Sequence, residues 1–241
     1  MIPLRDDAAS RRLTAVNTLL IVANLAVYAY EVSLGNAAGA FIDRYAMVPE
    51  RMAHLLGAAG HAAYATAHPA PAIVTPVTSM FLHGGILHIA GNMLYLFIFG
   101  AAVEEAMGHW KFLGFYFASG IAAALAMAAM MPNSKVPVIG ASGAIAGVLG
   151  AYFVLFPRAR VLTLMPLIVV IQMMEVPAVL YLLAWFALQL YWGVHESGQS
   201  SVAGGVAWWA HVGGFMFGVA LGPLLARQSA APRRRARRAR G

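Results

Sequence analysis

The succession of long apolar stretches and short polar ones predicts a bundle of membrane-spanning helices. A helix that crosses the hydrocarbon core of a bilayer needs about 20 consecutive, mostly apolar residues. Six stretches approach that length and predict helices near residues 13–30, 84–103, 112–131, 141–156, 178–193 and 207–226. Shorter stretches are tolerated where helices pack on protein and the bilayer thins locally. The first stretch exceeds the roughly 7–15 apolar residues of a secretory signal, and we therefore expect it to remain as the first span.

Composition strengthens this interpretation. Of the 241 residues, 61% are hydrophobic and 10% are charged, whereas a soluble domain has about 25% charged residues. The chain has no cysteine, which excludes disulfides, thiol catalysis and thiolate metal ligands. We expect an all-α, multi-pass membrane protein whose six-helix domain covers residues 13–226, preceded by a segment 1–12 and followed by a basic tail 227–241.

Positive charge sets the expected orientation. The stretch 161–176 is apolar enough for a seventh span, although Pro166 and Pro177 interrupt and bound it. With six spans, one face of the membrane carries thirteen of the sixteen basic residues: Arg5, Arg11, Arg12, Lys111, Arg158, Arg160 and the seven arginines from Arg227 to Arg240. Cytoplasmic loops are enriched in Lys and Arg, so both termini are expected in the cytoplasm, and 161–176 becomes an interfacial or re-entrant segment. The arginine tail is typical of a chain end held at anionic headgroups rather than of a nucleic-acid site.

Several residues are expected at the periphery. The external segment 31–80 is too long for a simple connection, and its mixture of apolar and charged residues favours an amphipathic element in the outer leaflet. The histidines of this segment are expected at the surface: His54, His61 and His68. Four tryptophans of the last two helices are expected at the interface or facing lipid: Trp185, Trp192, Trp208 and Trp209.

Four polar side chains fall at one depth in three predicted helices. His88 and Asn92 lie in the first two turns of the second helix, Ser142 in the first turn of the fourth, and His211 in the second turn of the sixth. All three helices enter from the outside in this topology, so a rise of 1.5 Å per residue places the four groups within roughly 10 Å of the outer ends. Each alone can be explained by packing or by a hydrogen bond between helices. Their coincidence in an apolar setting favours a functional site.

Small residues indicate which helices touch. They form one stripe in the sixth helix and a comparable stripe in the fourth: Gly214, Gly218 and Gly222, and Gly143, Gly147 and Gly150. Such stripes let helix backbones approach closely in lipid. We expect the fourth and sixth helices to pack face to face and to bring Ser142 toward His211.

This arrangement favours the chemistry of a serine nucleophile. A hydroxyl becomes nucleophilic when a base removes its proton, and histidine is the commonest base. No carboxylate falls in the apolar outer half of a predicted span, so a dyad of Ser142 and His211 is expected. The Ser142 amide lies in a first helical turn, where N–H groups lack intrahelical acceptors, and Asn92 and His88 could add donors for an oxyanion.

Three segments carry a resemblance to a known family. Residues 83–92 resemble the HxxxxHxxxN pattern of rhomboid proteins, residues 140–143 resemble their GxSG, and residues 210–218 resemble their AHxxGxxxG. The three segments occur in the same order, on the second, fourth and sixth predicted helices. The resemblance covers about residues 11–226.

The resemblance implies an intramembrane serine protease with a six-helix, rhomboid-like bundle in a bacterial inner membrane. Such a protein would cut single-span membrane proteins near the outer end of their transmembrane segment, without a cofactor. The resemblance makes Ser142 the nucleophile and His211 the base, with Asn92, His88 and the Ser142 amide as the oxyanion hole. Structural roles near the site fall to His83, Gly140, Gly143, Gly214 and Gly218. His83 is expected on a different helix face from His88.

The sequence departs from the family pattern at two places. Ala146 stands where some members have an aromatic residue that stacks on the histidine, so another group must orient the His211 ring. Val74-Thr75 stands where some members have a Trp-Arg pair, which leaves the anchoring of the external loop open.

Other functions fit the sequence less well. A rhomboid-like pseudoprotease that binds and escorts membrane clients would have lost Ser142 or His211, and both are present. A metalloprotease would need a motif such as HExxH, and His195-Glu196 lacks the second histidine. An α/β-hydrolase would have glycine two residues after the serine, where this chain has Ala144.

Overall fold

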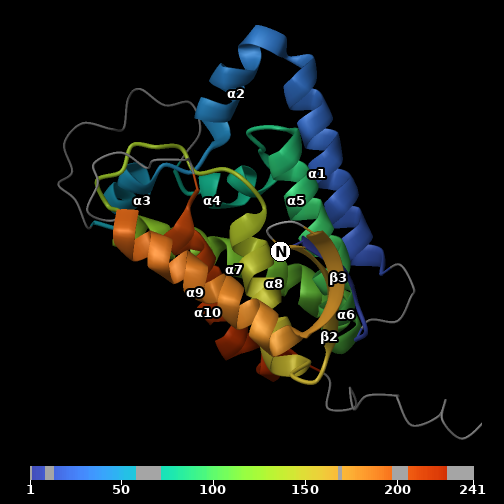
Figure 1. Ribbon diagram of the computed structural model, residues 1–241. Coiled ribbons are helices and arrows are strands. Elements are labelled where there is room, and N and C mark those ends of the chain that lie inside the picture. Colours follow the sequence, from blue (N-terminus) through green and yellow to red (C-terminus); the bar gives the residue numbers. More distant parts are fainter. Residues whose placement is uncertain (1, 9–13, 58–71, 168–169, 197–205, 227–241) are drawn as a thin grey trace, which may run out of the picture.

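The computed structural model describes residues 2–8, 14–57, 72–167, 170–196 and 206–226, and it is a bundle of long helices with a small sheet at one end (Figure 1). Five helices of this part of the chain are long and apolar enough to cross a membrane: α1 (Ala15–Ser33), the continuous run Ile86–Met107, α7 (His109–Met130), α9 (Ala178–Glu196) and α10 (Trp208–Leu225). The sixth apolar stretch forms α8 (Ser142–Leu155), which has 14 residues. All six predicted stretches are therefore helical, with ends within a few residues of those expected.

The second long helix is built from three parts. It begins as α5 (Ile86–Tyr95), passes through a π-helical turn (Leu96–Gly100) and ends as α6 (Ala101–Met107). The Asn17 side chain of α1 inserts at the π-helical turn, where its Nδ2 donates to the Leu96 carbonyl oxygen at 3.1 Å. A side chain that inserts into the hydrogen-bond ladder is a recognised cause of such a turn. This contact fixes α1 against the helix that carries His88 and Asn92.

A buried carboxylate completes the attachment of α1. Glu104 of α6 is 1% exposed and accepts hydrogen bonds from the backbone N–H groups of Val16 (3.0 Å) and Asn17 (2.6 Å). These N–H groups belong to the first turn of α1, where the helix offers them no acceptor and where its dipole favours negative charge. His109 also bonds to this carboxylate through Nδ1.

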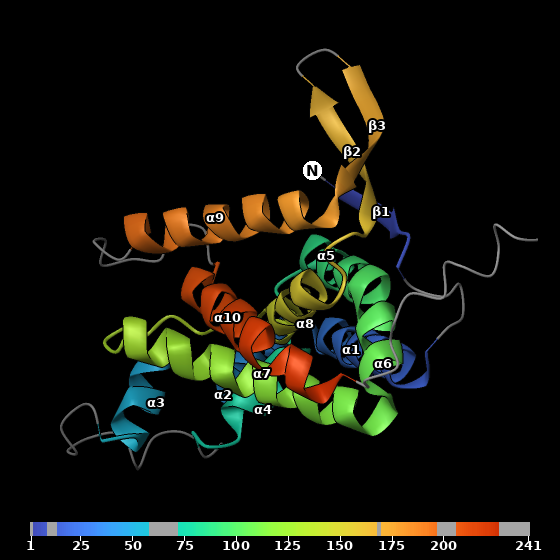
Figure 2. The same ribbon diagram turned by 90° about the horizontal axis from the view of Figure 1, so that it is seen from below.

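Helix α8 lies near the middle of the bundle and packs against both α10 and α7 (Figure 2). Its residues from Gly143 to Tyr152 are all buried. The predicted contact between the two glycine-lined helices is present, because a Cβ on Gly214 would overlap the Gly143 carbonyl oxygen and a Cβ on Gly218 would overlap that of Gly147. Only glycine permits this approach, and the approach sets the distance between the first turns of α8 and α10.

The external segment forms short helices that are tied to the loop before α8. Its elements are α2 (Ala38–Tyr45), α3 (Pro49–Leu55) and α4 (Thr75–Thr78). Met47 forms a backbone bridge with Val138, its N–H lying 3.1 Å from the Val138 oxygen. Thr78 Oγ1 donates to the Tyr45 carbonyl oxygen at 2.7 Å. These bonds anchor the external loop. They do so without the Trp-Arg pair of some family members, whose place is taken here by Val74-Thr75. His54 is partly buried, whereas His61 and His68 lie outside the described residues.

The expectation of an all-α fold is wrong in one region. The stretch 161–176, expected as an interfacial or re-entrant segment, forms the two antiparallel strands β2 (Arg160–Leu167) and β3 (Val170–Pro177), and β2 pairs antiparallel with β1 (Ile2–Asp6). The position of this hairpin relative to the membrane stays a prediction. The hairpin projects from the helices in Figure 2. Two prolines disfavour a helix here, and the buried Val161 and Thr163 alternate with more exposed residues, as in a half-buried strand. Segment 1–12 therefore contains a strand, and the tail 227–241 lies outside the described residues.

Candidate active site

Ser142 and His211 meet at the junction of α8 and α10. Ser142 is the first residue of α8 and His211 lies in the first turn of α10. The Ser142 Oγ atom is 2.7 Å from the His211 Nε2 atom, which is hydrogen-bond distance. His211 is buried, at 8% exposure, and Ser142 is partly buried. A hydroxyl bonded to an imidazole in this way is the arrangement from which a base can activate an oxygen nucleophile.

The other ring nitrogen of His211 bonds to a residue that sequence reasoning missed. Gln189 of α9 is 4% exposed, and its Oε1 atom lies 2.8 Å from His211 Nδ1. The available signal was a single amide side chain in the otherwise apolar and aromatic stretch of this helix, because a polar group inside a membrane defaults to a functional interpretation. Two of the tryptophans expected at the interface or facing lipid also lie close to the His211 ring, Trp185 at 5.9 Å and Trp208 at 6.3 Å between ring centroids.

The side-chain nitrogens of His88 and Asn92 lie beside Gly140, which is two residues before Ser142. The Gly84 N–H donates to His88 Nδ1 at 3.4 Å, so a neutral ring carries its proton on Nε2. A Cβ on Gly140 would lie 2.6 Å from that Nε2 atom and 3.4 Å from Asn92 Nδ2, which places both nitrogens beside Gly140. Within the described residues the buried Asn92 Nδ2 has no hydrogen-bond partner. An unpaired buried donor is unfavourable and fits a group kept for a ligand.

Gly140 is required for two reasons. Its φ of 114° lies in a region that L side chains rarely adopt, and a side chain would fill the space beside the two donors. The Gly140 N–H donates to the Ser79 carbonyl oxygen at 2.9 Å, which ties the turn before α8 to the segment before α5. The turn therefore brings the start of α8 next to the start of α5.

His83 supports this region from the turn before α5. Its backbone N–H donates to the Glu31 carboxylate, with oxygen distances of 3.2 and 3.3 Å, and its Nδ1 lies 3.2 Å from the Phe81 carbonyl oxygen. The His83 ring packs edge-on against His88 at 5.1 Å, so the expectation that the two histidines lie on different faces is wrong. Burial, and secondarily the neighbouring His88, lowers the pKa of His83 to about 4. The ring is thus neutral at physiological pH.

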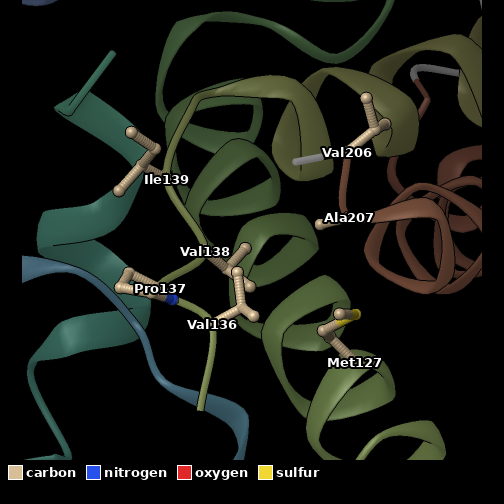
Figure 3. Close-up of a pocket in the computed structure, with 7 residues that line it drawn as sticks. All are labelled: Met127, Val136, Pro137, Val138, Ile139, Val206 and Ala207. Atoms are coloured by element: carbon tan, nitrogen blue, oxygen red, sulfur yellow. The ribbon is translucent and has the colours of Figure 1, made fainter. Parts of the chain in front are cut away.

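A small apolar hollow lies near the site (Figure 3). Its walls come from α7, from the loop before α8 and from the start of α10, and consist of Met127, Val136, Pro137, Val138, Ile139, Val206 and Ala207. The loop residues in its wall run directly into Gly140. The hollow offers apolar contact and no polar side chain.

Known proteins resemble this chain over its helical domain. Rhomboid protein 1, mitochondrial, of Saccharomyces cerevisiae is 31% identical over 153 residues, which cover 62% of this chain and 41% of the relative. Rhomboid protease AarA of Providencia stuartii is 33% identical over 153 residues, which cover 58% of this chain and 51% of the relative. Rhomboid protease GluP of Bacillus subtilis is 45% identical over 75 residues, which cover 31% of this chain and 14% of the relative. The chain thus spans about half or less of the length of each of these relatives.

A family profile described as a Rhomboid domain matches residues 71–228. That range is well over half of the chain and contains the segments 83–92, 140–143 and 210–218. It includes α5 to α10, on which Ser142, His211, His88 and Asn92 lie. The chain belongs to the Rhomboid family.

Proposed function

We propose that this multi-pass membrane protein is a serine endopeptidase that hydrolyses peptide bonds of single-span membrane proteins near the outer end of their transmembrane segment. The observation that carries the proposal is the 2.7 Å hydrogen bond between Ser142 Oγ and His211 Nε2. Two of the relatives are named rhomboid proteases, which supports the same class of reaction.

The first half of the reaction forms an acyl-enzyme. His211 Nε2 takes the hydroxyl proton of Ser142 while Oγ attacks the carbonyl carbon of the substrate. The carbonyl oxygen becomes an oxyanion, and its charge is stabilised by the Nε2–H of His88, the Nδ2–H of Asn92 and the Ser142 amide at the positive end of α8. The protonated His211 then donates its Nε2 proton to the leaving nitrogen, and the peptide C–N bond breaks.

The second half releases the acyl group. A water molecule gives a proton to His211 Nε2 and attacks the ester carbonyl carbon, and the same donors stabilise the second oxyanion. The ester bond to Ser142 breaks, and His211 returns its proton to Oγ. No cofactor enters either half.

The short central helix supports a site beneath the outer surface. In the proposed topology the domain 13–226 has six spans and both termini are cytoplasmic. Fourteen residues of α8 at 1.5 Å each extend about 21 Å, less than the roughly 30 Å of a hydrocarbon core. Ser142, at the outer end of α8, would then lie below the level of neighbouring helix ends. A layer of polar groups at this depth would let water reach a site inside the membrane.

The proposal is tested with purified protein in detergent or liposomes and a panel of single-span substrates, with the cut mapped by mass spectrometry. Ser142→Ala and His211→Asn should abolish cleavage, whereas Ser33→Ala, at an exposed hydroxyl of α1, should not change it. A fluorophosphonate probe should label the wild type and not Ser142→Ala. A client-binding pseudoprotease would fail to label. Cleavage by Ser142→Ala at the wild-type rate would overturn the assignment.

A further inference from the structure

We infer that Gln189 of α9 is the positioning residue that fixes the ring orientation and the proton of His211, an inference that rests on the proposed function. Its Oε1 atom lies 2.8 Å from His211 Nδ1. The Ser142 hydroxyl is hydrogen-bonded to the other ring nitrogen, Nε2. The imidazole is therefore held at both ends, by one helix on each side.

The direction of the Gln189 amide follows from its second hydrogen bond. Gln189 Nε2 donates to the carbonyl oxygen of Trp185, one turn earlier in α9, at 3.3 Å. The reverse orientation would place the amide oxygen against that carbonyl oxygen, and two acceptors cannot bond to each other. The oxygen end of the amide must then face the imidazole.

An acceptor at Nδ1 selects one tautomer of the neutral imidazole. With the proton on Nδ1 and donated to Gln189, the lone pair of Nε2 faces Ser142. That is the form that can accept the hydroxyl proton. The other tautomer would direct an N–H at the hydroxyl and leave Nδ1 without a donor, and a base in that form cannot act.

Helix α8 does not hold the ring by itself. Ala146, one turn after the serine, has only a methyl group and is fully buried. The ring instead lies beside Trp185, at 5.9 Å and an interplanar angle of 35°. Gln189 and Trp185 are four residues apart and share one face of α9. One helix thus supplies both the hydrogen bond and the flat surface that orient the base.

Gln189 moves no proton in the reaction. When Nε2 takes the serine proton, the imidazolium keeps its Nδ1–H bond to the neutral amide oxygen. A carboxylate at this position would stabilise the imidazolium more strongly, because the charges are opposite. Within the described residues, the groups that face His211 besides Gln189 and Trp185 of α9 are Ser142 of α8, Trp208 of α10 and, electrostatically, His88 of α5. None of these changes in a Gln189 variant.

The test compares three variants of the full-length protein in liposomes with a cleaved substrate. Gln189→Met keeps the side-chain length without an acceptor, and kcat should fall by roughly 10- to 100-fold with little change in KM, because a misplaced base loses reaction geometry. Gln189→Glu keeps the acceptor, should retain more kcat than Gln189→Met, and should move the acid limb of the pH–kcat profile to higher pH. Leu188→Ala, at an exposed neighbour on α9, should match the wild type.

Two results would overturn the role of Gln189. One is a wild-type kcat for Gln189→Met. The other is equal kcat and the same pH profile for the Met and Glu variants, which a side chain that only fills space would give. Both leave Ser142-dependent cleavage by the wild type intact. Failure of the proposed function would look different, since the wild type itself would neither cleave nor label with a fluorophosphonate.

Discussion

Gly218 of α10 faces Gly147 of α8 so closely that a Cβ on Gly218 would overlap the Gly147 carbonyl oxygen. The obstacle is backbone, which cannot rotate away as a side chain can. Each added methyl group must therefore push the two helices apart. Because Ser142 and His211 lie at one end of this contact, the packing of two glycines controls the distance between a hydroxyl and an imidazole.

Gly218→Ala should consequently weaken both stability and cleavage. Overpacking of this kind lowers the free energy of unfolding by about 1–3 kcal/mol, and separation of α8 from α10 lengthens the bond between Ser142 and His211. Unfolding in detergent and substrate turnover measure the two effects. Gly114→Ala in α7 is the matched control, since a Cβ there meets nothing within 4 Å. Equal stability and turnover of the two variants would contradict the argument.

Asn92→Ala should reduce turnover while leaving the fold intact. The Nδ2 group has no hydrogen-bond partner in the described part of the chain, so its loss removes no bond from the resting protein. Loss of one oxyanion donor lowers kcat by about 100- to 1,000-fold in other hydrolases, and we expect a decrease of that order with a nearly constant KM. Asn36→Ala, at an exposed amide, serves as the control. An increased KM at normal kcat would instead assign Asn92 to substrate binding.

Glu104→Ala should destabilise the protein through the loss of a contact that lies far from the active site. Two buried N–H groups of α1 would lose their acceptor, at 3.0 and 2.6 Å in the wild type. We expect the free energy of unfolding to fall by about 2–4 kcal/mol, with a normal kcat for the molecules that remain folded. Glu104→Gln keeps one acceptor oxygen and should lose roughly half as much. Chemical unfolding in detergent measures the free energy of unfolding of the wild type and the two variants. A Glu104→Gln variant as unstable as Glu104→Ala would argue against a role of Glu104 in capping α1.

The helices could be predicted because their signal is local. A span is one apolar run, and the glycines of α8 and α10 are visible as a stripe within each helix. The shared depth of Ser142 and His211 followed from counting residues along those runs. Contact between the two helices then brought the pair within 2.7 Å.

The features that were missed depend on distant parts of the chain. The β2–β3 hairpin is stabilised by pairing with β1, about 160 residues earlier in the sequence. The residue pattern within 161–176 does not indicate that β1 is its partner. Glu31 was placed at the start of a loop, yet it accepts the His83 N–H across 52 positions. Gln189 is a single amide in an otherwise apolar and aromatic stretch, and the sequence alone does not show which helix it faces. Its meaning became visible only once α9 was placed against α10.

His83 should make stability depend on pH. Its pKa is about 4 in the folded protein, against about 6.5 for an unperturbed histidine. Between these values the unfolded chain binds a proton that the folded protein does not, so stability falls as pH decreases from about 6.5 to 4 and is unaffected above that window. Thermal unfolding in detergent at a series of pH values measures this slope.

His83→Gln isolates the contribution of that side chain. The groups that face His83 are the Glu31 carboxylate and His88, and both remain in the variant, so any difference in slope belongs to residue 83. We expect the melting temperature of His83→Gln to fall less steeply below pH 6.5. Parallel curves would mean that His83 is protonated to the same extent in both states.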